Sequence, residues 1–409
     1  MVPVGFGKTV VSHTAAQELI AAGEVKRVLI IAPLRVCNEV WAIEHMNWEH
    51  LRPVGMATGS VAIRAAVIES DCEIVCINFE VLTWFFEHYA GEFDGLIIDE
   101  LTKFKGGGTQ FKALRKHVRK FKWRLGMTGT LAEEGLVGLF YQVMAIDGGK
   151  TFGKNKKEWL REYFYPADYE ERSWETDAVG SERLAAKIKH LIFEATVVEN
   201  KPDLVTEVVR LPMTESAQAM YDELRREGVV HGIEAVNAAV LSGKLEQVAN
   251  GFLYDGDELI DIHNEKIIAI INHAPVGRQF VIAYRYVEDL QKLREAFPDG
   301  RELRDSASVV ADFNSGALSA LFIHPNSGGH GLNLQISGCS DVIFYGPVWS
   351  RDQTDQVIGR VCRRGNPAPL VTVTTFVMLG TVEDVIMLPR LAGKGEAAAM
   401  FRDHLAGLI

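Results

Sequence analysis

Near its first residue the chain carries the segment Gly5-Phe6-Gly7-Lys8-Thr9, whose residue types suit the binding of nucleotide phosphates. In such a segment backbone N–H groups surround the phosphates, the lysine reaches the β and γ phosphates, and the threonine hydroxyl holds Mg²⁺. Residues 10–22 are apolar and free of proline, so they predict a helix whose N-terminus faces the same anion. Val2 stands where the full pattern has its first glycine, and a chance glycine-rich turn is the alternative interpretation.

An acidic pair follows an apolar stretch later in the first half of the chain. Residues 95–98 predict a strand, and Asp99-Glu100 ends it. An acidic residue at a strand end beside a phosphate loop can hold Mg²⁺, and a neighbouring glutamate can polarise the attacking water. Residues 126–130, Gly-Met-Thr-Gly-Thr, follow a short basic strand and can sense the γ-phosphate. In isolation, a strand cap explains the first segment equally well, and an ordinary strand–turn explains the second better.

A second polar group lies near the other end of the chain, in residues 356–366. Its Gln356, Arg360 and Arg363 can reach the same phosphates from a second domain. An arginine placed in this way neutralises charge on the transferred phosphoryl group, an effect of roughly 10³–10⁵ in rate. The two halves together predict a protein that couples ATP hydrolysis to the opening and closing of a cleft.

The order of these segments resembles the superfamily-two helicases, and in particular the compact phage and bacterial Swi/Snf-type DNA translocases. The stretches 97–105 and 345–350 fit the Swi/Snf-type group, and the resemblance covers most of residues 1–380. Six segments follow the order of the family: Gly7-Lys8-Thr9, Ile31-Ala32-Pro33, Asp99-Glu100, Thr128-Gly129-Thr130, residues 328–334, and residues 356–363. Six ordered motifs at family-like spacing make the resemblance specific.

The resemblance implies a role for each matching residue. The implied nucleotide site consists of Gly5, Gly7, Lys8 and Thr9 around the phosphates, Asp99 with Thr9 on Mg²⁺, and Glu100 as general base. The implied coupling and DNA residues are Thr128, Thr130, Gly331, Asn333, Lys103 and Lys105. The implied interface residues are Gln356, Arg360 and Arg363, with the two arginines as fingers. ATP and Mg²⁺ are the implied cofactors, and double-stranded DNA is the implied partner.

Several positions depart from the family pattern. The usual Asp-Glu-Ala-His reads Asp-Glu-Leu-Thr, with Thr102 in the place of the histidine, so the coupling role of that histidine is not carried over. Leu131, Cys362 and Asn366 replace a frequent proline, histidine and glutamine, and none of these changes removes a group that hydrolysis needs.

A further departure concerns the strand that runs into the phosphate loop of RecA-like domains. The sequence starts at the loop and does not include this strand. Without an inner strand, backbone groups on its neighbours lose their hydrogen-bond partners, which is costly. We therefore expect a fragment or a start site assigned too late, with low stability or poor ATP binding for the chain as written.

Alternating strands and helices predict an α/β fold with two RecA-like parallel-sheet domains and a helical insertion between them. The expected domains are residues 1–149, the insertion 150–262, the second domain 263–390 and a loosely packed helical tail 391–409. The expected strands are 27–32, 73–78, 95–98, 124–127, 279–283, 320–324, 341–345 and 371–378. Six aromatic residues crowd the insertion, and local core is favoured over base stacking for them: Trp159, Tyr163, Phe164, Tyr165, Tyr169 and Trp174.

Composition limits the class of protein. An apolar fraction of 47% in 409 residues supports full cores in two or three domains. No run approaches the ~18 apolar residues of a membrane helix, and the first residues do not resemble a signal peptide. Five cysteines without a paired framework indicate a reducing compartment. We therefore expect no membrane partner and a place in the cytoplasm, and the resemblance implies a bacterial or phage-infected cell.

The distribution of charge is more informative than its sum. The net charge of −11 has the wrong sign for a protein that coats nucleic acid. From Lys103 to Arg124, however, the chain has nine basic residues and no acidic one. Such a run can follow DNA phosphates, and a solvated helix face is an equal alternative.

These observations predict an ATP-dependent translocase on double-stranded DNA with little sequence preference. The alternatives among enzymes are a strand-separating DNA or RNA helicase and the motor of a restriction system. The alternative from another class is an ATP-regulated DNA-binding module without turnover.

Overall fold

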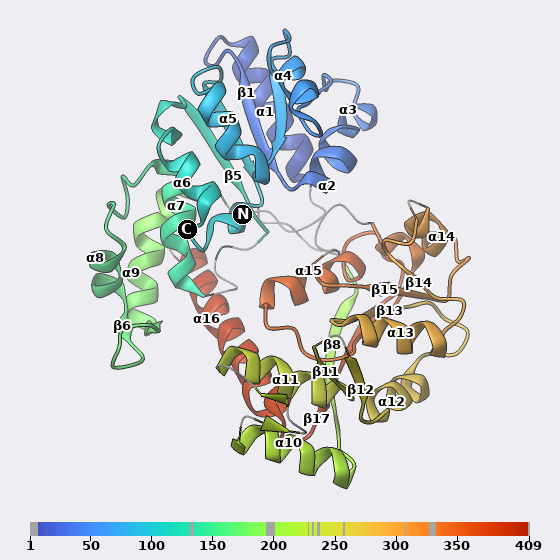
Figure 1. The fold of residues 1–409 in the computed structure, drawn as a ribbon. Helices are drawn as coiled ribbons and strands as arrows, with labels where there is room; N and C mark the ends of the chain where they lie inside the picture. The colour runs from blue at the N-terminus through green and yellow to red at the C-terminus, as the bar shows by residue number, and fades with distance from the viewer. Residues whose placement is uncertain are drawn as a thin grey trace. The chain divides into compact units, whose positions relative to one another are not determined.

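A computed structural model describes residues 7–129, 131, 135–193, 201–227, 229–230, 233–234, 238–256, 258–306, 308–326 and 333–407. The chain divides into two compact units, one made of Met1–Val197 and Lys394–Ile409 and the other of Val198–Gly393. Each unit is built around one parallel sheet with apolar cores on both of its faces (Figure 1). The predicted fold class, two RecA-like parallel α/β domains, is confirmed.

The first unit holds a five-stranded parallel sheet in the order β2-β3-β1-β4-β5. Its strands are β1 (Val28–Ala32), β2 (Gly55–Met56), β3 (Ile74–Asn78), β4 (Gly95–Asp99) and β5 (Trp123–Met127). β1 and β3 are buried along their whole length, which explains why all their residues except Asn78 are apolar. The four strands predicted for this unit lie where the sequence places them, within one residue at each end.

Alternate residues of β1 enter two different cores. Leu29 and Ile31 pack with α5, α6 and α7, whereas Val28 and Ile30 pack with α1. The helices of this unit include α1 (Lys8–Ala21), α2 (Leu34–Val36), α3 (Glu44–Asn47), α4 (Val61–Ile68), α5 (Leu82–His88), α6 (Thr109–Arg115), α7 (Leu139–Asp147), α8 (Lys156–Tyr163) and α9 (Ala178–Ile188).

β5 is an edge strand of the described sheet, because β4 is its hydrogen-bonded neighbour there. Its first four residues are half-buried, and Met127 at its end is buried. Gly126 lies so close to its neighbours that an added Cβ would be 2.7 Å from Ile146 Cδ1 and 2.9 Å from Leu101 Cδ2. The glycine of this motif therefore serves the packing of β5 against α7.

The second unit holds a six-stranded parallel sheet in the order β14-β15-β13-β16-β17-β8. Its strands are β8 (Asp203–Leu211), β13 (Phe280–Ala283), β14 (Arg301–Glu302), β15 (Ala320–Ile323), β16 (Asp341–Phe344) and β17 (Leu370–Met378). Its helices include α10 (Glu215–Glu227), α11 (Ala238–Asn250), α12 (Glu265–His273), α13 (Val287–Ala296), α14 (Val309–Asn314) and α15 (Arg351–Val361). A hairpin of β11 (Phe252–Asp255) and β12 (Glu258–Asp261) follows α11.

The segment 150–262, predicted as a helical insertion, is shared between the two units. α8 and α9 contribute Leu160, Leu184 and Ile188 to the core of the first unit. β8, which the sequence did not predict, pairs with β17 over all nine residues and belongs to the second sheet. The short ribbons β6 (Tyr165–Pro166) with β7 (Trp174–Glu175) and β9 (Val229–Val230) with β10 (Ile233–Glu234) complete the segment.

The aromatic cluster of this segment is only partly core. Trp159, Tyr163 and Phe164 are buried in the first unit, as predicted. Tyr165 and Tyr169 are exposed, so the core prediction is wrong for them. The physical reason is that Tyr165 starts the separate β6–β7 ribbon, which does not join the main sheet.

The tail forms α16 (Leu388–Gly407), drawn in red in Figure 1, and the division between the units falls within this helix. The predicted helix is confirmed. It is not loosely packed at Phe401, whose side chain is fully buried in the core of the first unit. The end of the chain therefore stabilises the domain with which the chain begins.

We expect Phe401→Ala to lower the free energy of unfolding of the first unit by about 3–5 kcal/mol, because it removes a buried aromatic ring and leaves a cavity. Of the seven tryptophans, all but Trp349 lie in this unit, so tryptophan fluorescence during denaturant unfolding follows it. Val179→Ala, at an exposed position of α9 in the same unit, is the control and should cost less than ~1 kcal/mol. Equal shifts for the two variants would contradict the prediction.

Candidate active site

The phosphate-binding segment leads directly into α1. Gly7 precedes the helix with φ 73°, a left-handed conformation that glycine adopts without strain. Lys8 and Thr9 form the first turn, where backbone N–H groups and the helix dipole favour an anion. Gly5 lies outside the described residues. The structure thus places the predicted lysine and threonine in the first turn of a helix, and their contact with phosphate stays a prediction.

Asp99 ends β4 in the same unit and is half-buried. The indole Nε1 of Trp41 donates a hydrogen bond of 2.9 Å to Asp99 Oδ2. Burial raises the pKa of Asp99, while the hydrogen bond from Trp41 and the positive charge of Lys8 oppose the rise. Lys8 and Asp99, 91 positions apart in the sequence numbering, therefore act on each other electrostatically, as a phosphate and Mg²⁺ site requires.

Glu100 has an unusual backbone. Its φ of 75° is left-handed, which costs energy for a residue with a side chain. Its N–H donates to the Met127 carbonyl at 3.1 Å, and its carbonyl accepts from the Lys103 N–H at 3.1 Å. The Thr102 hydroxyl donates to the Glu100 carboxylate. The residue that replaces the family's histidine thus contacts the predicted general base.

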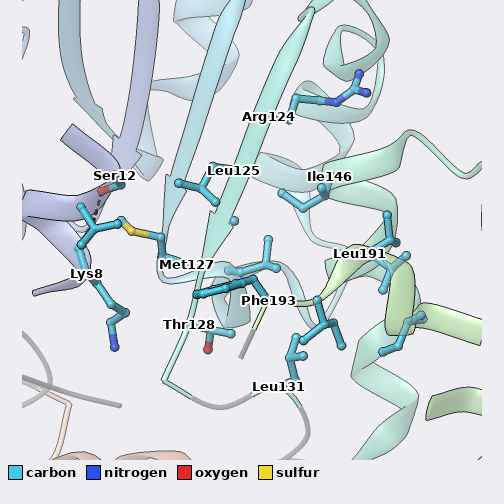
Figure 2. A pocket seen from close by; sticks show the side chains of 16 residues that line it. Lys8, Ser12, Arg124, Leu125, Met127, Thr128, Leu131, Ile146, Leu191 and Phe193 are labelled. Atoms are coloured by element: carbon cyan, nitrogen blue, oxygen red, sulfur yellow. Dashed lines mark hydrogen bonds between the residues drawn. The ribbon is translucent and has the colours of Figure 1, made fainter. Parts of the chain in front are cut away.

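Thr128 follows β5 and is buried. Together with Lys8 it lines a pocket of about 320 Å³ in the first unit, shown in Figure 2. Most of the lining is apolar and comes from β5, α7 and the residues after α9, such as Leu125, Ile146 and Leu191. The structure therefore brings two predicted residues to one cavity. Thr130 lies outside the described residues.

The basic run of the first unit is mostly exposed. Several of its members have structural partners: Arg119 donates to the Gly148 carbonyl at 2.9 Å, Arg124 donates to the carbonyls of Val118 and Phe121, and Lys122 pairs with Asp94 at 2.9 Å. The exposed members are Lys103, Lys112, Arg115, Lys116, Arg119, Lys120 and Lys122, whereas Lys105 is half-buried. Contact of Lys103 and Lys105 with DNA stays a prediction.

The predicted residues of the second unit lie on and around α15. Ser350 caps this helix by accepting from the Gln353 N–H at 3.2 Å. Gln356 donates to Asp352 at 3.1 Å one turn earlier, and Arg360 is buried. These contacts fix the helix that carries the predicted interface residues.

Arg363 follows α15 and lies beside a second predicted residue. Its guanidinium donates to Asn333 Oδ1 at 3.3 Å, which brings together two motifs 30 residues apart. Burial lowers the pKa of Arg363 from its ordinary value. Gly331, from the same motif as Asn333, lies outside the described residues. The finger roles of Arg360 and Arg363 stay predictions.

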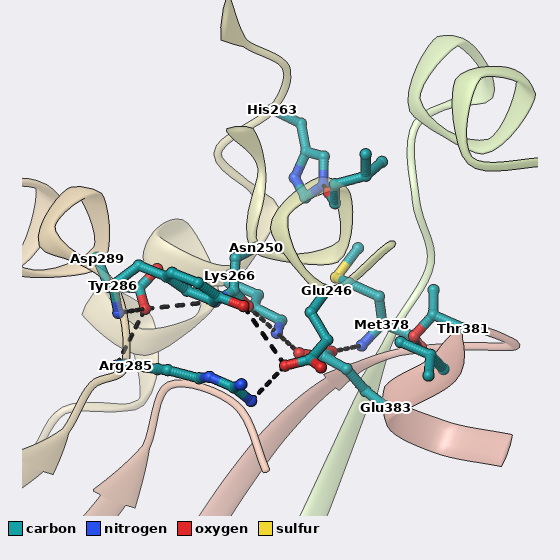
Figure 3. Close-up of polar contacts among 12 residues, drawn as sticks. Glu246, Asn250, His263, Lys266, Arg285, Tyr286, Asp289, Met378, Thr381 and Glu383 are labelled. Atoms are coloured by element: carbon teal, nitrogen blue, oxygen red, sulfur yellow. Dashed lines mark hydrogen bonds and ion pairs between the residues drawn. The ribbon is translucent and has the colours of Figure 1, made fainter. Parts of the chain in front are cut away.

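A buried polar cluster supports the loop that enters α15 (Figure 3). Trp349 in this loop donates to Glu246 Oε1 at 2.6 Å, and Arg285 pairs with Glu246 Oε2. Beside them, Lys266 pairs with Glu383 at 2.5 Å, and both side chains are almost fully buried. No local sequence pattern marks this cluster, because its members come from five separate segments of the chain.

The residues of the first unit fit Mg²⁺ as an ATP-bound cation. The described residues contain no group of three or more His, Cys, Asp or Glu that could hold a metal by itself. Mg²⁺ needs no such group, since it usually binds through one or two carboxylates, waters and substrate phosphates. Asp99 and the Thr9 hydroxyl are the predicted members of that donor set, and their contact with Mg²⁺ stays a prediction. No helix in the described part of the chain has the length and apolar character needed to cross a membrane.

Two family models match the chain. Residues 1–133 match the family described as Type III restriction enzyme, res subunit, and residues 263–365 match the Helicase conserved C-terminal domain. The chain belongs to the superfamily-two helicases. The superfamily-two helicase predicted from the order of the motifs is confirmed, and such helicases hydrolyse ATP. The assignment to the Swi/Snf type stays a prediction.

Individual proteins resemble this helicase over most of its length. Protein p41 of Acyrthosiphon pisum secondary endosymbiont phage 1 is 29% identical over 418 residues, which cover 94% of this chain and 90% of the relative. The uncharacterized ATP-dependent helicase YqhH of Bacillus subtilis is 22% identical over 423 residues, covering 94% and 72%. Among solved structures, the Sulfolobus solfataricus SWI2/SNF2 ATPase core in complex with dsDNA is 19% identical with a TM-score of 0.43, covering 98% and 90%.

Sequence reasoning missed two residues that contact the predicted catalytic groups. Trp41 reaches Asp99 across 58 residues of sequence, so no local pattern marks it. Thr102 was noted only as a departure from the family pattern. Its position two residues after Glu100 was the one signal that could have identified it.

His13 on α1 generates a prediction about pH. Its side chain is fully buried, both ring nitrogens lack a hydrogen-bond partner, and burial together with His45 and His50 lowers its pKa to about 4. Between pH 6.5 and pH 4 the unfolded chain binds a proton that the folded chain does not. Acidification through this window should therefore cost about 3 kcal/mol of stability through His13.

His13→Phe keeps a ring against Trp41 and removes the titrating group. We expect the stability of this variant to fall less than that of the wild type as the pH is lowered from 7 to 4. Denaturant unfolding at several pH values measures the difference between the two proteins. Parallel stability curves would show that His13 is not the neutral buried group described here.

Proposed function

We propose that this helicase uses ATP hydrolysis to move along double-stranded DNA. The observation that carries the proposal is the electrostatic interaction between Lys8, at the start of α1, and Asp99, at the end of β4. The next residue, Glu100, is held in a fixed position by Met127 and Thr102. This arrangement suits positioning and electrostatic stabilisation, which supply most of the catalysis of phosphoryl transfer.

Each predicted site residue of the first unit that the structure describes has a proposed task. The Lys8 ammonium and the N–H groups of the first turn bind the phosphates, and Thr9 and Asp99 hold the cation. Mg²⁺, when bound, neutralises charge on the phosphate oxygens. Glu100 accepts a proton from the attacking water. Thr128 lines the pocket with Lys8, and its proposed role is to couple the bound nucleotide to DNA contact.

The second unit supplies positive charge to the same reaction in this proposal. Arg360 and Arg363 act as fingers on the transferred phosphoryl group, and Gln356 assists them. The contact between Arg363 and Asn333 supports this assignment, because it links the two motifs that the family uses at the nucleotide and DNA.

Double-stranded DNA is the proposed partner on the basis of charge. The exposed lysines and arginines between Lys103 and Lys122 form a basic surface in a protein with a net charge of −11. A surface of this kind contacts phosphates and reads little sequence. The phage relative supports a place of action in the cytoplasm of a bacterial or phage-infected cell.

ATP hydrolysis with and without duplex DNA tests the proposal. We expect duplex DNA to stimulate turnover and both Lys8→Ala and Glu100→Gln to reduce stimulated turnover by at least about 10²-fold, since each removes a group that acts on the phosphates or the water. Nucleotide binding should fall only for Lys8→Ala. Wild-type turnover in folded Glu100→Gln would remove the general base from the proposal.

The same assay separates the alternatives. Displacement of a labelled strand would identify a strand-separating helicase. Nucleotide-dependent DNA affinity without turnover in the wild type would identify an ATP-regulated binding module.

Arg360→Ala tests the finger role. We expect this variant to bind nucleotide normally and to lose about 10³-fold in turnover, because the finger acts only on charge that develops during transfer. Arg351→Ala is a matched control on the same helix, where Arg351 pairs with Asp355 at the half-exposed surface. Unchanged turnover in Arg360→Ala would exclude Arg360 as a finger.

A further inference from the structure

Trp41 has no assigned task in the reaction, although it contacts the predicted Mg²⁺ carboxylate. Its side chain is fully buried, and its Nε1 donates to Asp99 Oδ2 at 2.9 Å. Among the described residues, this is the one hydrogen bond that the Asp99 carboxylate accepts. One carboxylate oxygen is therefore held, and Oδ1 is left for another ligand.

The backbone around Trp41 gives the indole little freedom. Trp41 ends η1 (Cys37–Trp41), which is a π-helical turn. Such turns are rare in proteins overall, but those that occur are often found at functional sites. Cys37 at its start donates its N–H to the Pro33 carbonyl at 2.9 Å and its thiol to the Ala32 carbonyl at 3.6 Å. The turn is thereby fastened to the end of β1, the strand that pairs with β4.

Helix α1 also packs near the indole. The His13 ring lies 6.0 Å from the Trp41 ring, centroid to centroid, and is itself fully buried. The cores around α1, η1 and β1 share one apolar cluster. Trp41 is thus clamped between the helix that begins with Lys8 and the strand beside the one that ends with Asp99.

We propose that Trp41 is a positioning residue that orients the Asp99 carboxylate for Mg²⁺ of the bound nucleotide. A carboxylate on a short side chain can rotate, and a hydrogen bond to one oxygen fixes the direction of the other. Residues that orient a metal ligand in this way typically change metal affinity by 10–100-fold when replaced. This inference rests on the proposed function only for the identity of the ligand as Mg²⁺-nucleotide.

Trp41→Phe tests the inference, because it keeps an aromatic ring and removes the N–H donor. ADP binding is measured by calorimetry in EDTA and across a Mg²⁺ titration. We expect ADP affinity in EDTA to match the wild type, and the Mg²⁺ concentration for half-maximal tightening to rise about tenfold. The Mg²⁺ requirement of ATP hydrolysis should shift in parallel, with turnover recovered at high Mg²⁺.

Trp48→Phe is a matched control. It removes an indole–carboxylate hydrogen bond of 3.2 Å to Glu44, at an exposed position seven residues further along the chain. We expect no change in the Mg²⁺ requirement for this variant. In an Asp99→Asn background, Trp41→Phe should add nothing to the defect in Mg²⁺-dependent ADP binding, because the two residues act as one unit.

Two results would overturn the inference. One is a wild-type Mg²⁺ requirement in folded Trp41→Phe, and the other is an equal loss of ADP affinity with and without Mg²⁺, which marks a purely structural role. If Trp41→Phe does not fold, benzothienylalanine at position 41 keeps the shape of the indole with sulfur in place of the N–H, and the same shift is expected.

The failure of this inference can be told apart from that of the proposed function. A shifted Mg²⁺ requirement for ADP binding in a protein without ATP turnover would support the role of Trp41 and reject the translocase. DNA-stimulated ATP turnover in the wild type, together with an unchanged Mg²⁺ requirement in Trp41→Phe, would support the translocase and reject the role of Trp41.

Discussion

The first unit depends on the parallel pairing of β4 with β1 and β5. Parallel strands bring their carboxyl ends to one edge of a sheet, so residues that follow them meet there. Asp99 and Glu100 arrive on β4, and Thr128 arrives after β5. The hydrogen bond from the Glu100 N–H to the Met127 carbonyl continues this pairing by one residue at the cost of a left-handed backbone. The register of β4 against β5 therefore sets how far Asp99 and Glu100 lie from Thr128 in space.

Much of this fold could be predicted because its central strands are buried on both faces. Residues 74–77 and 95–98 are runs without a polar side chain for that reason, and periodicity is not needed to recognise them. β8 escaped prediction because it is an edge strand, largely exposed and rich in polar residues such as Glu207 and Arg210. Its partner β17 is more than 150 residues later in the chain, so no local pattern records the pairing.

The candidate site divides in the same way. Lys8, Thr9, Asp99 and Glu100 could be proposed from the sequence because phosphate chemistry needs those residue types in short, ordered segments, and their roles stay predictions. The groups that orient them could not, since an indole or a hydroxyl becomes functional only through a neighbour that the fold supplies. From the sequence alone, Trp41 is indistinguishable from an ordinary core residue. Only the structure shows that its N–H donates a hydrogen bond to Asp99.

The two units handle buried charge in different ways. In the first, the Asp99 carboxylate has one hydrogen bond and the charge of Lys8, which leaves capacity for a cation. In the second, Lys266 and Glu383 satisfy each other in a nearly fully buried pair. Removing one member of such a pair leaves an uncompensated charge and is strongly destabilising. The first arrangement therefore suits the binding of a ligand, and the second suits the rigid support of the loop that carries Trp349 into α15.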